Sequence, residues 1–196
     1  KYSGGASAGY ATATSDYGPG ITKLWGVENG GSYGYYVNNE MAEGLTDTVK
    51  AGDYINAYVY TDMTAFSDTY CYFNVNRLDA AKGDTVSLTL SSIGFDESWN
   101  SVVLPVEGAV ITVDGVQTEF KTDAQGKASI TLDKAGEIVI SAKSDTRTLV
   151  PPVCIASVEA PEQSGLGTVW YIVIAAAVVV IAAAIIVTVK KKNNGK

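Results

Sequence analysis

The sequence predicts a mainly β protein with two small β-rich domains followed by one C-terminal transmembrane helix. Three observations support this fold class. Polar and apolar residues alternate with a period of two in most segments between residues 54 and 158, which is typical of strands with one buried face. Turn signals rich in Gly, Asn and Asp separate these segments at short intervals. A run of 21 residues without charge, Pro or Gly, 169–189, is long enough for a membrane span.

The first strands are expected after an irregular start. Residues 1–20 are rich in Gly, Ala, Ser, Thr and Tyr and show no apolar period, so we expect a lead-in without regular structure. From residue 21 onward, short apolar and aromatic segments favour strands. We expect these strands at 24–27, 32–39, 54–60 and 69–75. Together with the lead-in they make up a first β domain over residues 1–75.

Tyrosines occupy one face of at least two of these strands. In the segment 54–60 they alternate with apolar residues, and the segment 69–75 repeats the arrangement. Tyr is an amphipathic contact residue with low conformational entropy, so such a face suits a flat ligand or a protein surface. Because Tyr is also a good strand former, an ordinary exposed sheet would show the same pattern. The residues expected to bind a ligand are Trp25, Tyr33, Tyr36, Asn38, Tyr58, Tyr60, Tyr70 and Tyr72.

Several short motifs in the first domain match a known family. They are the Leu-Trp-Gly of 24–26, the Gly-Tyr-Tyr-Val-Asn-Asn of 34–39, the Gly-Asp-Tyr-Ile of 52–55 and the Tyr-Val-Tyr of 58–60. Through them residues 20–74 resemble the C-terminal domain of transcobalamin and intrinsic factor, which is also attached to many bacterial surface proteins. Members of that family begin with a further strand and helix, so the resemblance implies that this domain is truncated at Lys1. It also implies a corrinoid ligand, because the vertebrate members help enclose one.

A second β domain is expected over residues 76–158. We expect its strands at 85–90, 109–113, 128–132, 137–142 and 153–158. Turns such as Asp114-Gly115 separate short strands, which predicts a β-sandwich. The turn chemistry of residues 108–142 is similar to that of prealbumin-like and Cna-B-like modules, Ig-like sandwiches of bacterial surface proteins. Some of those modules carry a Lys–Asn crosslink, but the last strand here contains no Asn, so we expect none. Asp114 and Asp123 lie in turns that explain them without a metal, and we expect no metal site.

The two cysteines, Cys71 and Cys154, fall on the expected last strands of the two domains. Outside the cell a disulfide between them is permitted, and it would tie the two domains together. Each cysteine also alternates with apolar neighbours, and a buried free Cys behaves as a small hydrophobe. Both states remain open from the sequence.

The run 169–189 is expected to anchor the chain in a membrane. As a helix with about 1.5 Å rise per residue it would reach roughly 30 Å, the thickness of the hydrocarbon core. Trp170 and Tyr171 lie at its start, and a basic tail, 190–196, follows it, which places that tail in the cytoplasm. Residues 1–168 are then extracellular, with 159–168 as a polar spacer. The chain thus predicts a single-pass protein of the cell membrane.

Charge and composition exclude several functions. All 21 acidic residues precede the membrane run, together with 10 of the 14 basic ones, and an acidic outer region argues against nucleic acid as a partner. The chain has no His and no nucleophile motif in the required context, so we do not expect an enzyme.

Two classes of function remain for the outer region. It is either a surface protein that captures a small nutrient, such as a corrinoid, or an adhesin-like structural protein that binds a surface glycan or protein. The shape of the tyrosine surface separates them, since a corrinoid needs a concave surface and an adhesin a flat exposed one.

Overall fold

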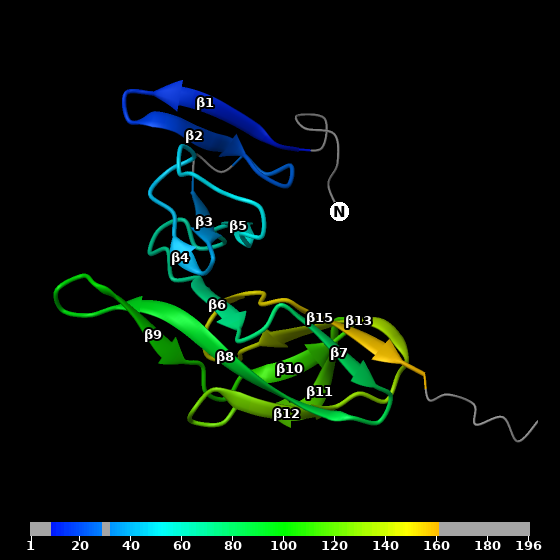
Figure 1. The fold of residues 1–196 in the computed structure, drawn as a ribbon. Helices are drawn as coiled ribbons and strands as arrows, with labels where there is room; N and C mark the ends of the chain where they lie inside the picture. The colour runs from blue at the N-terminus through cyan, green and yellow to red at the C-terminus, as the bar shows by residue number, and fades with distance from the viewer. Residues whose placement is uncertain (1–8, 29–31, 161–196) are drawn as a thin grey trace, which may run out of the picture. The chain divides into compact units, whose positions relative to one another are not determined.

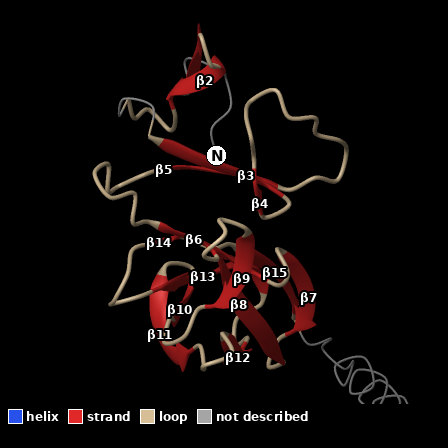
Figure 2. Ribbon diagram, turned by 90° about the vertical axis from the view of Figure 1, so that its left-hand side faces the viewer, coloured by secondary structure: helices blue, strands red, loops and turns tan. Residues whose placement is uncertain are grey.

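The computed structural model describes residues 9–28 and 32–160. Within these residues the secondary structure consists of fifteen strands and no helix, so the predicted mainly β character is confirmed (Figure 1 and Figure 2). In the same ranges no helix is long and apolar enough to cross a bilayer. The predicted span 169–189 and the tail 190–196 lie outside the described residues. Lys1–Glu159 form one compact unit, and of the second unit, Ala160–Lys196, only Ala160 is described.

Most of the strands form a sandwich of two five-stranded sheets. The first has the order β11-β10-β13-β15-β7, and the second has the order β12-β8-β6-β14 with β9 paired to β8. The strands of the first sheet are β7 (Arg77–Ala81), β10 (Val110–Val113), β11 (Val116–Lys121), β13 (Gly136–Lys143) and β15 (Cys154–Glu159). Those of the second are β6 (Thr69–Phe73), β8 (Thr85–Phe95), β9 (Ser101–Pro105), β12 (Lys127–Thr131) and β14 (Leu149–Val150).

The sandwich is held together by the alternating apolar residues that predicted its strands. Leu88 and Leu90 of β8 face Ile138 and Ile140 of β13 in one core, and all four are at most 1% exposed. The predicted Asp114-Gly115 hairpin is confirmed: both residues have positive φ, 49° and 81°, and Val113 pairs directly with Val116. This is the two-residue turn that suits the twist of antiparallel strands.

A smaller sheet, with the order β4-β3-β5, belongs to the first half of the chain. It consists of β3 (Tyr33–Val37), β4 (Glu40–Met41) and β5 (Ile55–Val59). A tight turn at Asn38 and Asn39, with φ of 53° and 67°, joins β3 to β4. Asn tolerates this left-handed conformation better than most residues, so the Asn-Asn pair directs the hairpin here.

Two expectations for the N-terminal region are wrong. The expected irregular lead-in contains a hairpin of β1 (Ala11–Ser15) and β2 (Gly18–Lys23), whose ladder of backbone hydrogen bonds needs no apolar period. The expected strand at 24–27 is instead a tight turn closed by the Leu24–Val27 bridge, because Trp25 and Gly26 adopt positive φ.

The strand β6 is placed differently from its expected position as the last strand of the first domain. It pairs with β8 and β14 and is therefore part of the sandwich. The two faces of β6 pack in different hydrophobic clusters. Cys71 and Phe73 lie in the sandwich core, while Tyr70 packs with Tyr36 and Tyr58 of the small sheet. The expected domain boundary at residue 75 therefore comes after β6, a strand that belongs to the sandwich and also contacts the small sheet.

Candidate functional site

Three of the predicted ligand-binding tyrosines meet in one stack. Tyr36 comes from β3, Tyr58 from β5 and Tyr70 from β6, and they are 4%, 8% and 2% exposed. The rings of Tyr36 and Tyr70 are parallel within 4°, with centroids 3.6 Å apart. Tyr58 lies beside them, with its centroid 6.3 Å from Tyr36 and 6.2 Å from Tyr70. These three residues are called the tyrosine stack below.

The hydroxyl groups near the stack have partners inside the protein. The Tyr70 hydroxyl donates to Asn39 Oδ1 at 2.9 Å and accepts from Asn56 Nδ2 at 3.3 Å. The Tyr58 hydroxyl donates to that of Tyr60 at 3.0 Å. Burial raises the pKa of Tyr36 and of Tyr58, and it raises the pKa of Tyr70 to about 12. All three phenols are therefore neutral at physiological pH.

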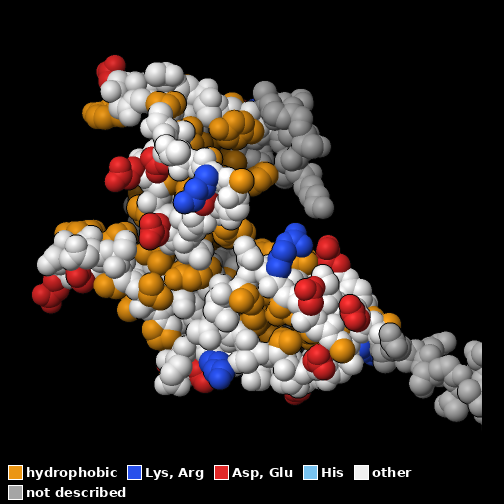
Figure 3. Space-filling view, in the orientation of Figure 1, with side chains coloured by type: hydrophobic (Ala, Val, Ile, Leu, Met, Phe, Trp, Pro, Cys, Tyr) orange, Lys and Arg blue, Asp and Glu red, His pale blue; other side chains and the backbone are white. Residues whose placement is uncertain are grey.

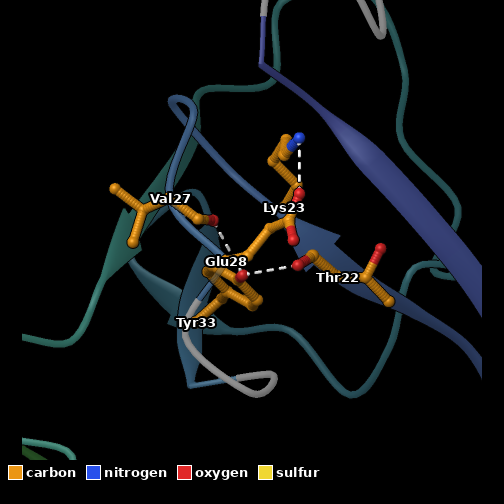
Figure 4. Close-up of polar contacts among 5 residues, drawn as sticks. All are labelled: Thr22, Lys23, Val27, Glu28 and Tyr33. Atoms are coloured by element: carbon orange, nitrogen blue, oxygen red, sulfur yellow. Dashed lines mark hydrogen bonds and ion pairs between the residues drawn. The ribbon is translucent and has the colours of Figure 1, made fainter.

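The tyrosine stack is thus a packing layer between the small sheet and the sandwich, whereas the sequence favoured an open tyrosine face. Tyr33, on the other face of β3, is also buried. Figure 4 shows its hydroxyl directed at Thr22 and Val27. Its hydroxyl lies 2.8 Å from Thr22 O and 2.9 Å from Val27 O and shares its hydrogen between them. Lys23 pairs with Glu28 at 2.5 Å in the same region.

Trp25 and Asn38 also make contacts within the protein. The indole of Trp25 is 46% exposed, and its Nε1 donates to Ala57 O at 3.3 Å. Asn38 donates from Nδ2 to Asp53 Oδ1 and accepts from the Tyr54 backbone N–H, both at 2.9 Å. Its side chain thereby fastens the β3–β4 turn to the chain entering β5. The last two of the eight predicted site residues, Tyr60 and Tyr72, are half-buried.

Beside the tyrosine stack lies a polar cavity of about 350 Å³, called the asparagine pocket below. The small sheet, β6 with the segment that follows it, and the approach to β15 together form its wall. The twelve lining residues are Asn38, Asn39, Tyr54, Asn56, Cys71, Tyr72, Phe73, Asn74, Val75, Asn76, Arg77 and Val153. Of this set, the sequence predicted Asn38 and Tyr72 as ligand-binding residues and Cys71 as a possible disulfide partner. The asparagines concentrated in the turns and strands that carry the tyrosines are a sequence signal that could have identified more of the pocket.

Several of these asparagines keep unused hydrogen-bonding capacity. Asn39 and Asn56 each engage one amide atom with Tyr70, and Asn74 Oδ1 accepts from the Thr89 backbone N–H at 2.8 Å. In the described part of the chain, three remaining amide atoms have no hydrogen-bond partner: Nδ2 of Asn39, Oδ1 of Asn56 and Nδ2 of Asn74. The side chains of Asn76 and Arg77 also have none among the described residues. The pocket therefore offers amide donors, amide acceptors and a guanidinium to a bound molecule.

Charge is sparse in the asparagine pocket although the protein is acidic. On the face drawn in Figure 3, acidic side chains are spread over the surface rather than gathered in one patch. Arg77 is the single charged residue among the twelve that line the pocket. Among the described residues, no group of three or more His, Cys, Asp or Glu lies close enough together to hold a metal ion.

A second cavity, of about 280 Å³, lies on the opposite face of the small sheet and is largely apolar. Its lining includes Ile21, Leu24, Tyr35, Leu45 and Val49. Asp47 also lines it, but the Asp47 carboxylate already accepts from the Glu43 backbone N–H at 2.8 Å. This cavity therefore provides little specific polar recognition.

Both cysteines are free thiols in the core of the sandwich, so the disulfide alternative is not formed. The Cys71 thiol donates to Val150 O at 3.2 Å. Burial raises the pKa of Cys71 to about 12 and that of Cys154 to about 11. Because the thiolate is the reactive form, neither cysteine is suited to be a nucleophile.

No protein-family model, curated protein sequence or solved structure matches this chain.

Proposed function

We propose that this chain is a membrane-anchored extracellular protein of the adhesin-like class that binds a carbohydrate in the asparagine pocket. The observation that carries the proposal is a cavity of about 350 Å³ with five asparagines and two tyrosines in its wall. Sugar hydroxyls both donate and accept hydrogen bonds, and amide side chains offer both functions. Apolar sugar faces pack on aromatic rings, and the half-buried Tyr54 and Tyr72 supply such rings.

The pocket's size and the packing of the tyrosines favour a sugar over the corrinoid that the family resemblance implies. A volume of about 350 Å³ is near the lower end of the range of small-molecule sites, roughly 300–1,000 Å³. That space suits one sugar residue and is too small for a corrin macrocycle with its side chains. The tyrosines that would contact a corrin ring are instead stacked on one another.

The proposal assigns no catalysis to this site. None of the residues lining the asparagine pocket is Asp, Glu or His, so the pocket has no carboxylate or imidazole for general acid–base chemistry. The Cys71 thiol is kept protonated by its raised pKa. Binding without turnover is therefore the simpler interpretation.

The anchor and the domain families are part of the same proposal. The uncharged run 169–189 with its basic tail supports a single span, with the pocket on the outside of the cell. The Asp114-Gly115 hairpin and the two-sheet core support an Ig-like module of the prealbumin or Cna-B type for the sandwich. The Asn-Asn turn and the pairing of β3 with β5 support a transcobalamin-C-like origin for the small sheet.

A glycan array probed with the full chain in lipid nanodiscs tests the proposal. We expect saturable binding to a subset of glycans, weakened at least about tenfold by Asn76→Ala, because that amide is available to the ligand. Gln125→Ala, an exposed amide outside the pocket, is the matched control and should leave binding unchanged. Cobinamide is titrated in parallel. Failure of the folded chain to bind any glycan, or equal binding by Asn76→Ala, would refute the carbohydrate proposal, and tight cobinamide binding would restore the corrinoid one.

A further inference from the structure

The asparagine pocket contains a cation, Arg77, that forms no ion pair among the described residues. Arg77 and Arg147 are the two arginines of the chain, whose other 12 basic residues are lysines. Arg77 lines the pocket, and its nearest acidic neighbour in sequence on the same strand face is Asp79. The ion pairs in the described residues join Lys23 to Glu28 and Lys134 to Asp114 and leave Arg77 out. Its guanidinium is therefore available to an external anion.

The backbone of Arg77 is held in place by its pairing with the neighbouring strand β15. Arg77 is the first residue of β7, where its Cα pairs with Ile155 of β15, and the carbonyl of Asn76 accepts from the Ile155 N–H at 2.9 Å. The next residue, Leu78, packs against the sandwich core, so alternation along the strand turns the Arg77 side chain to the opposite face. Rigid strands position recognition groups more exactly than loops do.

The amides around Arg77 complete a mixed recognition set. Asn74 and Asn76 precede it in the chain. Asn39 in the β3–β4 turn and Asn56 on β5 belong to the small sheet, which forms another part of the pocket wall. A guanidinium binds a carboxylate through two parallel hydrogen bonds, while amides suit neighbouring hydroxyls. A molecule that matches both parts carries one carboxylate on a ring with several hydroxyls.

We infer that the asparagine pocket binds the carboxylated sugar residue of an acidic glycan, with the Arg77 guanidinium on its carboxylate. This inference rests on the proposed carbohydrate function and specifies its ligand. Uronic acids and sialic acids share the required chemistry. The pocket volume of about 350 Å³ suits one such residue, with the rest of the glycan outside the pocket.

Calorimetric titration of the full chain in nanodiscs with matched sugar pairs tests the inference. The probes are methyl glucuronide against methyl glucoside, and the methyl glycoside of N-acetylneuraminic acid against its methyl ester. We expect at least one acid to bind about 10- to 100-fold more tightly than its neutral partner. Arg77→Gln should remove that preference by weakening the binding of the acid much more than the binding of its neutral partner. Arg77→Lys should restore only part of it, because an ammonium lacks the bidentate geometry. The exposed Arg147→Gln is the matched control and should retain the preference.

The outcomes separate this inference from the function on which it rests. Equal binding of acids and neutral partners, with no effect of Arg77→Gln, would overturn the inference and leave carbohydrate binding in place. Tighter binding of a sulfated sugar than of either acid would overturn the assignment to a carboxylate. If the folded chain binds neither the acidic nor the neutral sugars of the array and the titrations, both proposals fail. A preference for the glucuronide or for the sialoside identifies which acidic sugar is recognised.

Discussion

The rings of Tyr36 and Tyr70 lie in parallel contact, with centroids 3.6 Å apart and planes 4° apart, and so join the small sheet to the sandwich. The two residues are 34 positions apart in the sequence and come from strands that share no hydrogen bonds. The Tyr70 hydroxyl adds bonds to Asn39 and Asn56, two residues that also line the asparagine pocket. Packing between the two parts and the shape of the pocket are therefore coupled through Tyr70.

We expect Tyr70→Phe to destabilise the fold by about 1–2 kcal/mol. The substitution preserves the ring and its stacking but removes the hydroxyl, leaving Asn39 Oδ1 without its hydrogen bond. Tyr17→Phe is the control, because the Tyr17 side chain is fully exposed and its change should stay within about 0.5 kcal/mol. Thermal or urea unfolding of the full chain, followed by tyrosine fluorescence, gives both values. Equal stability of the two variants would show that the Tyr70 hydroxyl bonds contribute nothing measurable.

Gly34→Ala should destabilise the protein by about 1–3 kcal/mol, because the new methyl group overlaps the ring of Tyr58. Gly34 and Tyr58 are directly paired across β3 and β5, and the ring lies over the glycine. Gly20→Ala in β2 is the matched control, since a Cβ there meets no atom within 4 Å. The comparison uses the same unfolding measurement. A Gly34 variant as stable as the Gly20 variant would mean that the Tyr58 ring moves aside at no cost.

Stability should fall as the pH rises from about 10 towards about 12. Burial raises the pKa of Tyr70 from 10.0 to about 12, so the unfolded chain loses this proton while the folded chain still holds it. In that window the folded state binds more protons than the unfolded state, and a rising pH therefore favours unfolding. The raised pKa of Cys71 acts in the same direction. Urea midpoints measured across the window should decline less steeply for Tyr70→Phe than for the native chain, and identical slopes would contradict the role of Tyr70.

Neither cysteine should react with a maleimide while the protein is folded. Cys71 is 1% exposed and Cys154 is 0% exposed, and burial raises the pKa of both thiols. Unfolding in denaturant should expose two thiols to the reagent, as counted by mass spectrometry. A folded sample that labels rapidly would contradict the buried positions. A mass lower by two hydrogens with no labelling after unfolding would show that the two cysteines are bridged.

Local patterns predicted much of the strand content but not all of it. The alternation in 54–60, 85–90 and 137–142 corresponds to β5, β8 and β13, because each of these strands has one face in a core. The strands β7, β9, β11 and β14 of the sandwich were not predicted, and neither were β1, β2 and β4 nearer the N-terminus. In β9 the residues Val103 and Leu104 are 62% and 47% exposed, so the burial that produces an alternating pattern is missing. Such strands are held by backbone hydrogen bonds to their neighbours, and these bonds do not require polar and apolar side chains to alternate.

Local sequence was enough to predict the β class, the hairpin at Asp114-Gly115 and the separation of tyrosine and apolar faces on β5 and β6. Turn chemistry and period-two alternation are local properties, so they can be recognised without the fold. What covers each face depends on the fold. A strand's alternation says that its two sides differ, but the partner of each side depends on pairings between segments far apart in the chain. Through those pairings Tyr36 and Tyr70 became a buried contact, and Asn56 and Arg77 came to line one pocket.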